Sequence, residues 1–267
     1  MTLRAPEADL TGWTCEPFTA AGFTHDVYYK GAGPGVVLIP EMPGVHVGVL
    51  ALGNHLVDNG FTVAIPSLYG TPGMSPVSPA LVPNLLRGCV AKEFAALATN
   101  KDRPVADYLR ALARDLNAKT PGKGVGVIGQ CFSGGFALAA AVDDSVLAPV
   151  MSQPSVPLPL TAVMRRDPGV SEREMKVIEK RAAEQGLCAL GLRFSGDPMV
   201  PSERFATLKD RLGDNFEVIE IDSSRGNLGG FGRAAHSVLT REVREVDGQA
   251  AYEARKRVVE FLRDRLV

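Results

Sequence analysis

Short apolar runs alternate along the chain with segments whose apolar residues recur at helical spacing. The apolar runs predict buried strands within residues 33–40, 61–70, 125–129, 146–152, 188–197 and 216–222. The helical spacing predicts helices within 44–60 and at 104–119, 136–142, 171–186, 202–212 and 251–266. Before the first run, residues 11–30 have the pattern of two strands joined by a turn at Ala21–Gly22.

This alternation continues without an interrupting linker or an internal repeat. It favours a single α/β domain over residues 1–267, with a mostly parallel central sheet and helices on both faces. Residues 71–91, rich in proline and glycine, predict an irregular excursion from this pattern. Ligands of such sheets bind outside the carboxyl ends of the strands, so chemistry is expected there.

Composition narrows the class of partner. With 29 basic and 30 acidic residues, the net charge of −1 gives no reason to expect a nucleic acid or a membrane surface as partner. The N-terminus has no apolar signal segment, and the four cysteines form no close pairs, so we expect a reduced, cytoplasmic protein without a metal or organic cofactor. A small-molecule substrate is the expected partner, and a monomer and a small homo-oligomer both remain open.

One cysteine stands at the tightest point of a predicted strand-to-helix turn. The segment Gly129-Gln130-Cys131-Phe132-Ser133-Gly134-Gly135 has the form of a nucleophile elbow, with cysteine in place of serine. A buried structural cysteine is the alternative, and we adopt it for Cys15, Cys89 and Cys188. The glycines on both sides of Cys131 favour the catalytic interpretation, because a sharp elbow leaves little room for side chains.

A cysteine nucleophile needs a base that is oriented by a third group. His236 is the only histidine after the elbow, and Asp197 lies between the two in a loop that follows a predicted strand. Nucleophile, acid, histidine is the chain order of α/β hydrolases. Taken singly, Asp197 is also typical of a turn or a helix cap, and His236 of a surface loop.

Two glycine patterns offer competing interpretations. Residues 124–129 match G-x-G-x-x-G, but these glycines lie within the predicted strand and not in a phosphate-binding turn, which disfavours a dinucleotide site. The glycine-rich stretch 225–233 lacks the lysine and the hydroxyl residue of a P-loop, and we interpret it as a mobile loop.

Together these motifs resemble the dienelactone hydrolase family, the cysteine branch of the α/β hydrolases. The resemblance covers most of residues 20–265: the elbow, the strand ending at Glu41, the segment 195–201 around Asp197, and His236-Ser237. Relative to compact members, the segments 71–100 and 154–186 look longer, and we expect both to shape the pocket.

The resemblance implies roles for individual residues. Cys131 would be the nucleophile, His236 the base, Asp197 its orienting acid, and Glu41 a carboxylate against the thiol. An acid at the start of a helix is the alternative for Glu41. The backbone N–H groups of Phe132 and Met42 would form the oxyanion hole.

The resemblance also implies residues that bind a substrate carboxylate. Arg87, Ser237 and Tyr69 are the candidates, and Arg241 lies close to the histidine segment. A solvated loop cation is the alternative for Arg87.

The predicted function is hydrolysis of a lactone or small carboxylic ester, of dienelactone type and carrying a carboxylate. A thioesterase or general carboxylesterase on the same triad is the alternative among enzymes. A binding protein that keeps this fold without turnover is the alternative outside them.

Overall fold

The computed structural model describes residues 10–73, 94 and 98–267, and in this part of the chain eight strands form one sheet. Its order is β1-β2-β4-β3-β5-β6-β7-β8; β2 runs antiparallel to both of its neighbours, and the remaining strands are parallel. The strands are β1 (Thr14–Ala20), β2 (Phe23–Lys30), β3 (Gly35–Ile39), β4 (Thr62–Pro66), β5 (Val125–Gln130), β6 (Val146–Ser152), β7 (Ala189–Phe194) and β8 (Phe216–Ile221). The prediction of a mostly parallel α/β sheet is confirmed.

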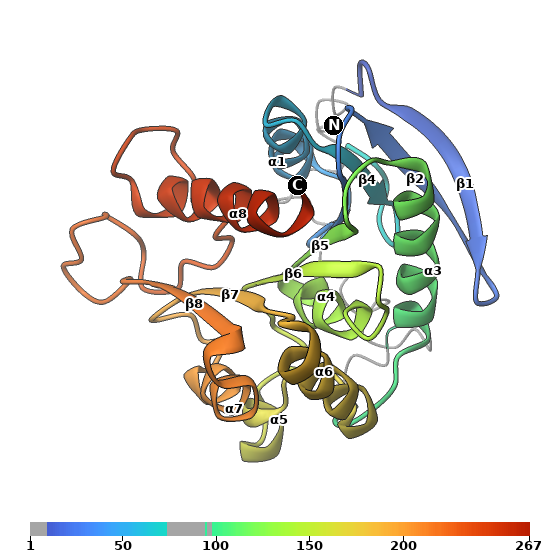
Figure 1. Ribbon diagram of the computed structural model, residues 1–267. Coiled ribbons are helices and arrows are strands. Elements are labelled where there is room, and N and C mark those ends of the chain that lie inside the picture. The colour runs from blue at the N-terminus through green and yellow to red at the C-terminus, as the bar shows by residue number, and fades with distance from the viewer. Residues whose placement is uncertain (1–9, 74–93, 95–97) are drawn as a thin grey trace.

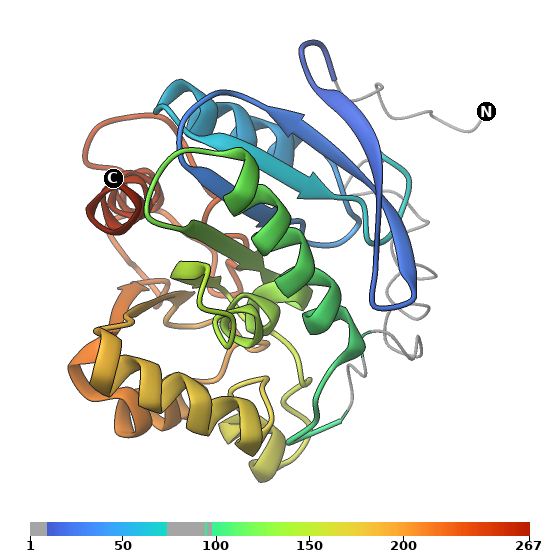
Figure 2. The same cartoon turned by 45° about the vertical axis from the view of Figure 1, so that its right-hand side comes forward.

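Helices cover both faces of this sheet (Figures 1 and 2). On one face lie α3 (Pro104–Lys119), α4 (Gly134–Ala140), α6 (Glu172–Gln185) and α7 (Ser202–Leu212), which share one buried apolar cluster with the strands. On the other face, α1 (Val47–Asp58) and α8 (Ala250–Leu266) share a second cluster with them. The two clusters explain why β3 and β5 are apolar at successive positions: each strand is buried on both sides.

The structure agrees with most of the predicted elements and adds one. The turn between β1 and β2 places Ala21 and Gly22 at φ 51° and 81°, and Gly60 follows α1 at φ 89°. The additional element is the short helix α5 (Ala162–Arg166), in a proline-containing stretch that carries no helical period. Its Thr161 hydroxyl caps the helix by accepting a hydrogen bond from the Met164 amide.

A fully buried arginine on α7, Arg204, binds the segment after β6 through its backbone carbonyl oxygens. The Arg204 guanidinium donates to the carbonyl oxygens of Asp167 and Pro157, each at 2.6 Å, and to those of Pro154 and Met164. Burial lowers the pKa of Arg204 to about 10, because the charge is removed from water with only carbonyl dipoles in direct contact. Arg204 therefore fixes the path of the loop that begins at the carboxyl end of β6.

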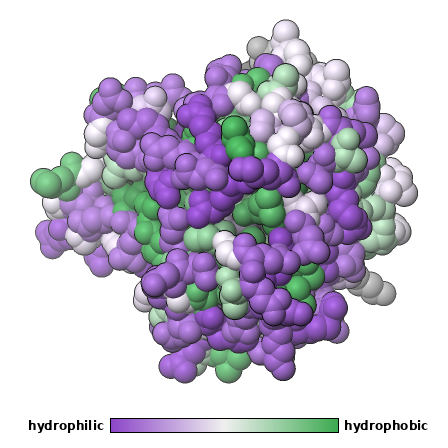
Figure 3. Space-filling view, in the orientation of Figure 1, coloured by the Kyte–Doolittle hydropathy of each residue, from purple (hydrophilic) through white to green (hydrophobic). Residues whose placement is uncertain are grey.

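The surface agrees with the mixed composition. Hydrophilic residues cover most of the face seen in Figure 3, and the hydrophobic residues visible there lie mainly toward its centre and at its left edge. Within the described residues, no helix is long and apolar enough to cross a membrane.

Candidate active site

Cys131 occupies a strained turn at the carboxyl end of β5. Its φ is 51°, in the left-handed region that side-chain-bearing residues rarely adopt, and a short 3-10 turn (Cys131–Ser133) leads into α4. A Cβ added to Gly129 would lie 2.3 Å from the Ser133 carbonyl oxygen, and one added to Gly134 would lie 2.6 Å from the Pro154 Cα. The glycines on either side of Cys131 are thus required by the close approach of backbone.

The Ser133 hydroxyl joins this elbow to the loop after β3. It accepts a hydrogen bond from the Gln130 amide at 2.9 Å and lies within 3.2 Å of the carbonyl oxygens of Ile39, Pro40 and Gln130. Its proton can reach one of these carbonyls at a time. The residues after Pro40 are therefore held beside the nucleophile turn.

His236 and Asp197 meet although 39 residues separate them in the sequence. The His236 Nδ1 lies 2.6 Å from the Asp197 Oδ2, and the aspartate side chain is only 1% exposed. The other carboxylate oxygen of Asp197 accepts a hydrogen bond from the Met199 amide at 2.9 Å. The carboxylate is thereby oriented to hold the imidazole with its proton on Nδ1.

The charge state of His236 depends on the two groups beside it. Burial by itself lowers the pKa of His236. Negative charge on the Cys131 sulfur and the hydrogen bond with Asp197 raise it by more than burial lowers it, so the pKa is about 11. The Nε2 atom of His236 is buried and has no hydrogen-bond partner among the described residues. Cys131 and His236 line the same cavity, and the second ring nitrogen of His236 is held by a carboxylate, so the arrangement can supply a nucleophile and its base.

Glu41 lies at the centre of a buried polar cluster beside this pair. Its carboxylate accepts hydrogen bonds from the Ser237 hydroxyl at 2.8 Å, from the Thr240 hydroxyl, and from the Gln153 amide at 3.3 Å. The His46 Nε2 lies 3.4 Å away. Burial raises the pKa of Glu41, but these neighbours, His46 foremost, lower it below its ordinary value overall. Glu41 therefore stays ionised and ties the loop that carries His236 to the loop after β3.

The structure gives the Cys131 thiol a hydrogen-bond partner that the sequence did not indicate. The Cys131 Sγ lies 3.5 Å from the hydroxyl of the buried Ser155, whose amide donates to the Cys131 carbonyl oxygen at 3.0 Å. No hydrogen bond joins Cys131 and Glu41, although the two line the same cavity. Glu41 thus faces the thiol across the cavity, with its own oxygens already occupied.

A cavity of about 320 Å³ brings these residues together. Its lining joins the loop after β3, the elbow, the loop after β6 and the segment with His236, and includes both predicted oxyanion-hole residues, Met42 and Phe132. Leu158 and Met199 add apolar surface, while Ser237 and Arg241 add polar groups. The volume suits a small organic molecule.

One of the predicted substrate-binding residues, Tyr69, is not in this lining. The Tyr69 hydroxyl donates to the Pro40 carbonyl oxygen, and its ring packs edge-on against that of Phe132, with 5.7 Å between the ring centroids. Tyr69 therefore supports the loop after β3 without lining the cavity. Arg87 lies outside the described residues, as do Cys89 and residues 74–91 of the predicted irregular excursion. Of the two arginines considered, Arg241 is the one that the structure places at the cavity.

Sequence reasoning missed the four residues that complete the polar surroundings of the site: His46, Gln153, Ser155 and Thr240. Gln153 and Ser155 directly follow β6, so the rule that chemistry gathers at the carboxyl ends of strands contained the signal for them. His46 caps α1 by accepting the Gly48 amide at 3.0 Å, and this leaves its other nitrogen to face Glu41. In the described part of the chain, no group of three or more histidine, cysteine or acidic side chains is arranged to hold a metal ion.

The sheet, the elbow and the acid–histidine pair at the strand ends define an α/β hydrolase. The chain belongs to the dienelactone hydrolase family, whose model matches residues 24–266. It is thus a hydrolase by family. No curated protein sequence matches it.

Solved structures of this family have the same fold. A protein named as a dienelactone hydrolase from Klebsiella pneumoniae gives a TM-score of 0.62 at 16% identity, covering 94% of this chain and 98% of that one. A dienelactone hydrolase-like promiscuous phosphotriesterase from metagenomic libraries gives 0.61 at 17% identity, with 96% and 98% covered. A dienelactone hydrolase from Anabaena variabilis gives 0.59 at 14% identity, with 96% and 98% covered.

Proposed function

We propose that this hydrolase cleaves a lactone or small carboxylic ester through a covalent acyl intermediate on Cys131. The observation that carries the proposal is the meeting of three groups at one cavity: a cysteine on a strained elbow, a histidine, and a buried aspartate 2.6 Å behind that histidine. A nucleophile, a base and an orienting acid are the parts that acyl transfer requires.

The reaction follows from the roles of these groups. The Cys131 thiolate attacks the carbonyl carbon, and the carbonyl oxygen takes up the negative charge. The N–H groups of Phe132 and Met42 then stabilise this oxyanion. The His236 imidazolium gives its proton to the departing alkoxide, and the neutral imidazole next activates the water that hydrolyses the thioester. Asp197 keeps the imidazole in the tautomer that both steps need.

The cavity favours a substrate with an apolar body and a carboxylate. Met42, Leu158 and Met199 contribute apolar surface, and Arg241 is the arginine among the described residues of its lining. No ion pair joins Arg241 to a carboxylate of the described residues, and a guanidinium at this wall can hold a substrate anion through paired N–H donors. Ser237 adds a hydroxyl at the same wall.

The test is hydrolysis of an activated aryl ester by the wild type and by Cys131→Ala. We expect the variant to lose essentially all turnover, whereas Cys15→Ala keeps it. Cys15 is an exposed free thiol on β1, so the prediction of a buried structural cysteine is wrong for Cys15, whereas Cys188 is buried as predicted. Mass spectrometry of a rapidly quenched reaction should find the acyl group on Cys131. Equal turnover by wild type and Cys131→Ala would refute the proposal, and a wild type inactive on every ester and thioester would favour a binding protein.

A substrate panel separates the classes of acyl substrate. Lactones, open-chain esters and thioesters are compared as free acids and as neutral methyl esters, in wild type and Arg241→Gln. We expect the free acids to lose about tenfold or more in kcat/KM in the variant, because one charged hydrogen bond contributes about 1.5–3 kcal/mol. Equal losses of kcat/KM for neutral and charged substrates would show that Arg241 does not bind the substrate carboxylate. Thioesters hydrolysed faster than lactones would make the protein a thioesterase.

A further inference from the structure

The glycine-rich loop at residues 225–233 begins and ends with arginine, and the proposed reaction uses neither of them. Its backbone is held by Asn227, whose amide group donates to the carbonyl oxygens of Ser224 and Phe231 at 2.9 and 2.8 Å and accepts the Phe231 amide at 2.9 Å. The ring of Phe231 is buried against Phe194, with 4.9 Å between the ring centroids. The loop interpreted from sequence as mobile is therefore internally hydrogen-bonded and anchored to β7.

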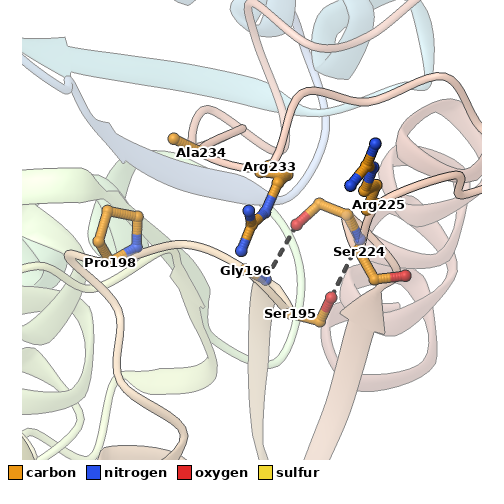
Figure 4. Close-up of a pocket in the computed structure, with 8 residues that line it drawn as sticks. Ser195, Gly196, Pro198, Ser224, Arg225, Arg233 and Ala234 are labelled. Carbon is orange, nitrogen blue, oxygen red and sulfur yellow. Dashed lines mark hydrogen bonds between the residues drawn. The ribbon is translucent and has the colours of Figure 1, made fainter.

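This anchoring brings Arg225 and Arg233 to the same cavity, although eight positions separate them. The cavity has a volume of about 570 Å³ and lies at the carboxyl ends of β7 and β8, where Ser195, Gly196, Ser223 and Ser224 also line it. Figure 4 shows Arg233 extending toward Gly196, with Ser224 and Arg225 next to one another to its right. It is a different cavity from the one that contains Cys131.

The charges at this cavity are unbalanced. Neither arginine forms an ion pair with a carboxylate of residues 10–73, 94 or 98–267. The neighbouring acid, Asp222, is not in the lining, and its carboxylate accepts the Ser224 amide at 2.8 Å. Two guanidinium groups thus present hydrogen-bond donors at the cavity, and among the described residues no acidic side chain lines it.

We propose that this cavity is a binding site for a phosphorylated small molecule. Guanidinium groups match phosphate oxygens with paired N–H donors, and two of them in one lining suit a ligand that carries more than one negative charge. The cavity has room for more than a single inorganic phosphate, so a larger molecule that carries the phosphate fits it.

Backbone segments at this site lie next to those that carry Asp197 and His236. A Cβ added to Gly196 would lie 2.5 Å from the Arg233 carbonyl oxygen, so the segment before Asp197 and the segment before His236 are in close contact here. A ligand held by Arg233 thus lies beside the loops that position the acid and the base. The phosphate can belong to the leaving group of the substrate or to a separate effector.

Inorganic pyrophosphate is the probe, and its binding is measured by calorimetry with wild type and with Cys131→Ala, so that the result does not depend on turnover. We expect saturable binding by both, weakened about tenfold or more in Arg233→Gln and in Arg225→Gln. Arg244→Gln is the matched control, since Arg244 is exposed on the next loop and does not line the cavity. Higher ionic strength should weaken binding in the wild type, because the arginines are exposed and their charge is screened.

Three results would overturn the proposal: no binding of pyrophosphate, an equal loss of affinity in Arg244→Gln, or tighter binding of the dicarboxylate malonate than of pyrophosphate. Circular dichroism melts of the variants verify that a loss of binding is not a loss of fold. Kinetics then separate the two sources of the phosphate. Pyrophosphate that competes with a phosphorylated thioester indicates a leaving-group site, and pyrophosphate that alters turnover of an uncharged ester without competing indicates an effector site.

Discussion

Replacing Asp197 by asparagine tests how much of the site depends on one buried hydrogen bond. The carboxylate is 1% exposed, and one oxygen lies 2.6 Å from His236 Nδ1 while the other accepts the Met199 amide. Asparagine has the same shape, so its carbonyl oxygen can keep the Met199 amide while its NH2 group faces His236. The imidazole must then accept at Nδ1 and carry its proton on Nε2, where a base is needed.

The expected loss has two parts. A hydrogen bond to a charged group contributes about 1.5–3 kcal/mol, and the variant forfeits this stabilisation of the imidazolium. Restoring the productive tautomer breaks the new amide–imidazole hydrogen bond, at a cost that we take to be similar. Together they amount to about 3–6 kcal/mol, or roughly a hundredfold to ten-thousandfold in kcat/KM.

The assay is steady-state hydrolysis of an activated ester by Asp197→Asn, with Asp210→Asn as control. Asp210 is exposed on α7, so its replacement should leave kcat/KM unchanged. Thermal melts identify variants that lose activity by unfolding. A kcat/KM for Asp197→Asn within about threefold of the wild type would refute the assignment of Asp197 as the orienting acid, as would an equal loss in the control.

Three further predictions concern charge. In Cys131→Ser the pKa of His236, about 11 in the wild type, should fall, because a serine hydroxyl places no negative charge beside the imidazole, whereas Asp197 remains. An NMR titration of labelled histidines measures this pKa, and an unchanged titration would contradict the coupling. Glu41 has a lowered pKa, so its contribution to the free energy of unfolding is present above pH 4.5 and is lost as the pH falls through the folded pKa. Glu41→Gln should therefore unfold about 1–3 kcal/mol more easily at pH 7, with a flatter acid dependence in urea titrations, and a wild-type profile would contradict this. Arg204→Met leaves four carbonyl oxygens without their donor, at about 1 kcal/mol each, and recovers part of this cost because a charge is no longer buried. We expect the free energy of unfolding, measured in urea, to fall by about 2 kcal/mol, and a more stable variant would contradict this.

The sequence by itself determined the alternation of elements and the location of the chemistry. Apolar runs buried on both faces and helical periods are local patterns, which is why the parallel sheet and the elbow at Cys131 could be predicted. The linear sequence also contains the order of Cys131, Asp197 and His236 and their positions after predicted strands. They implied that these residues meet, without giving any distance between them.

Only the tertiary structure decided which side chains touch. The donors on Glu41 come from Ser237 and Thr240, nearly 200 residues away, and from Gln153, and no local pattern marks such a set. Short polar elements such as α5 are likewise set by caps and packing, which periodicity does not record. The two arginines of the glycine-rich loop face one cavity because Asn227 and Phe231 fold the chain between them, and sequence spacing alone had suggested a mobile loop. Contacts of this kind depend on packing across the whole sheet, so they are properties of the folded chain and not of any segment.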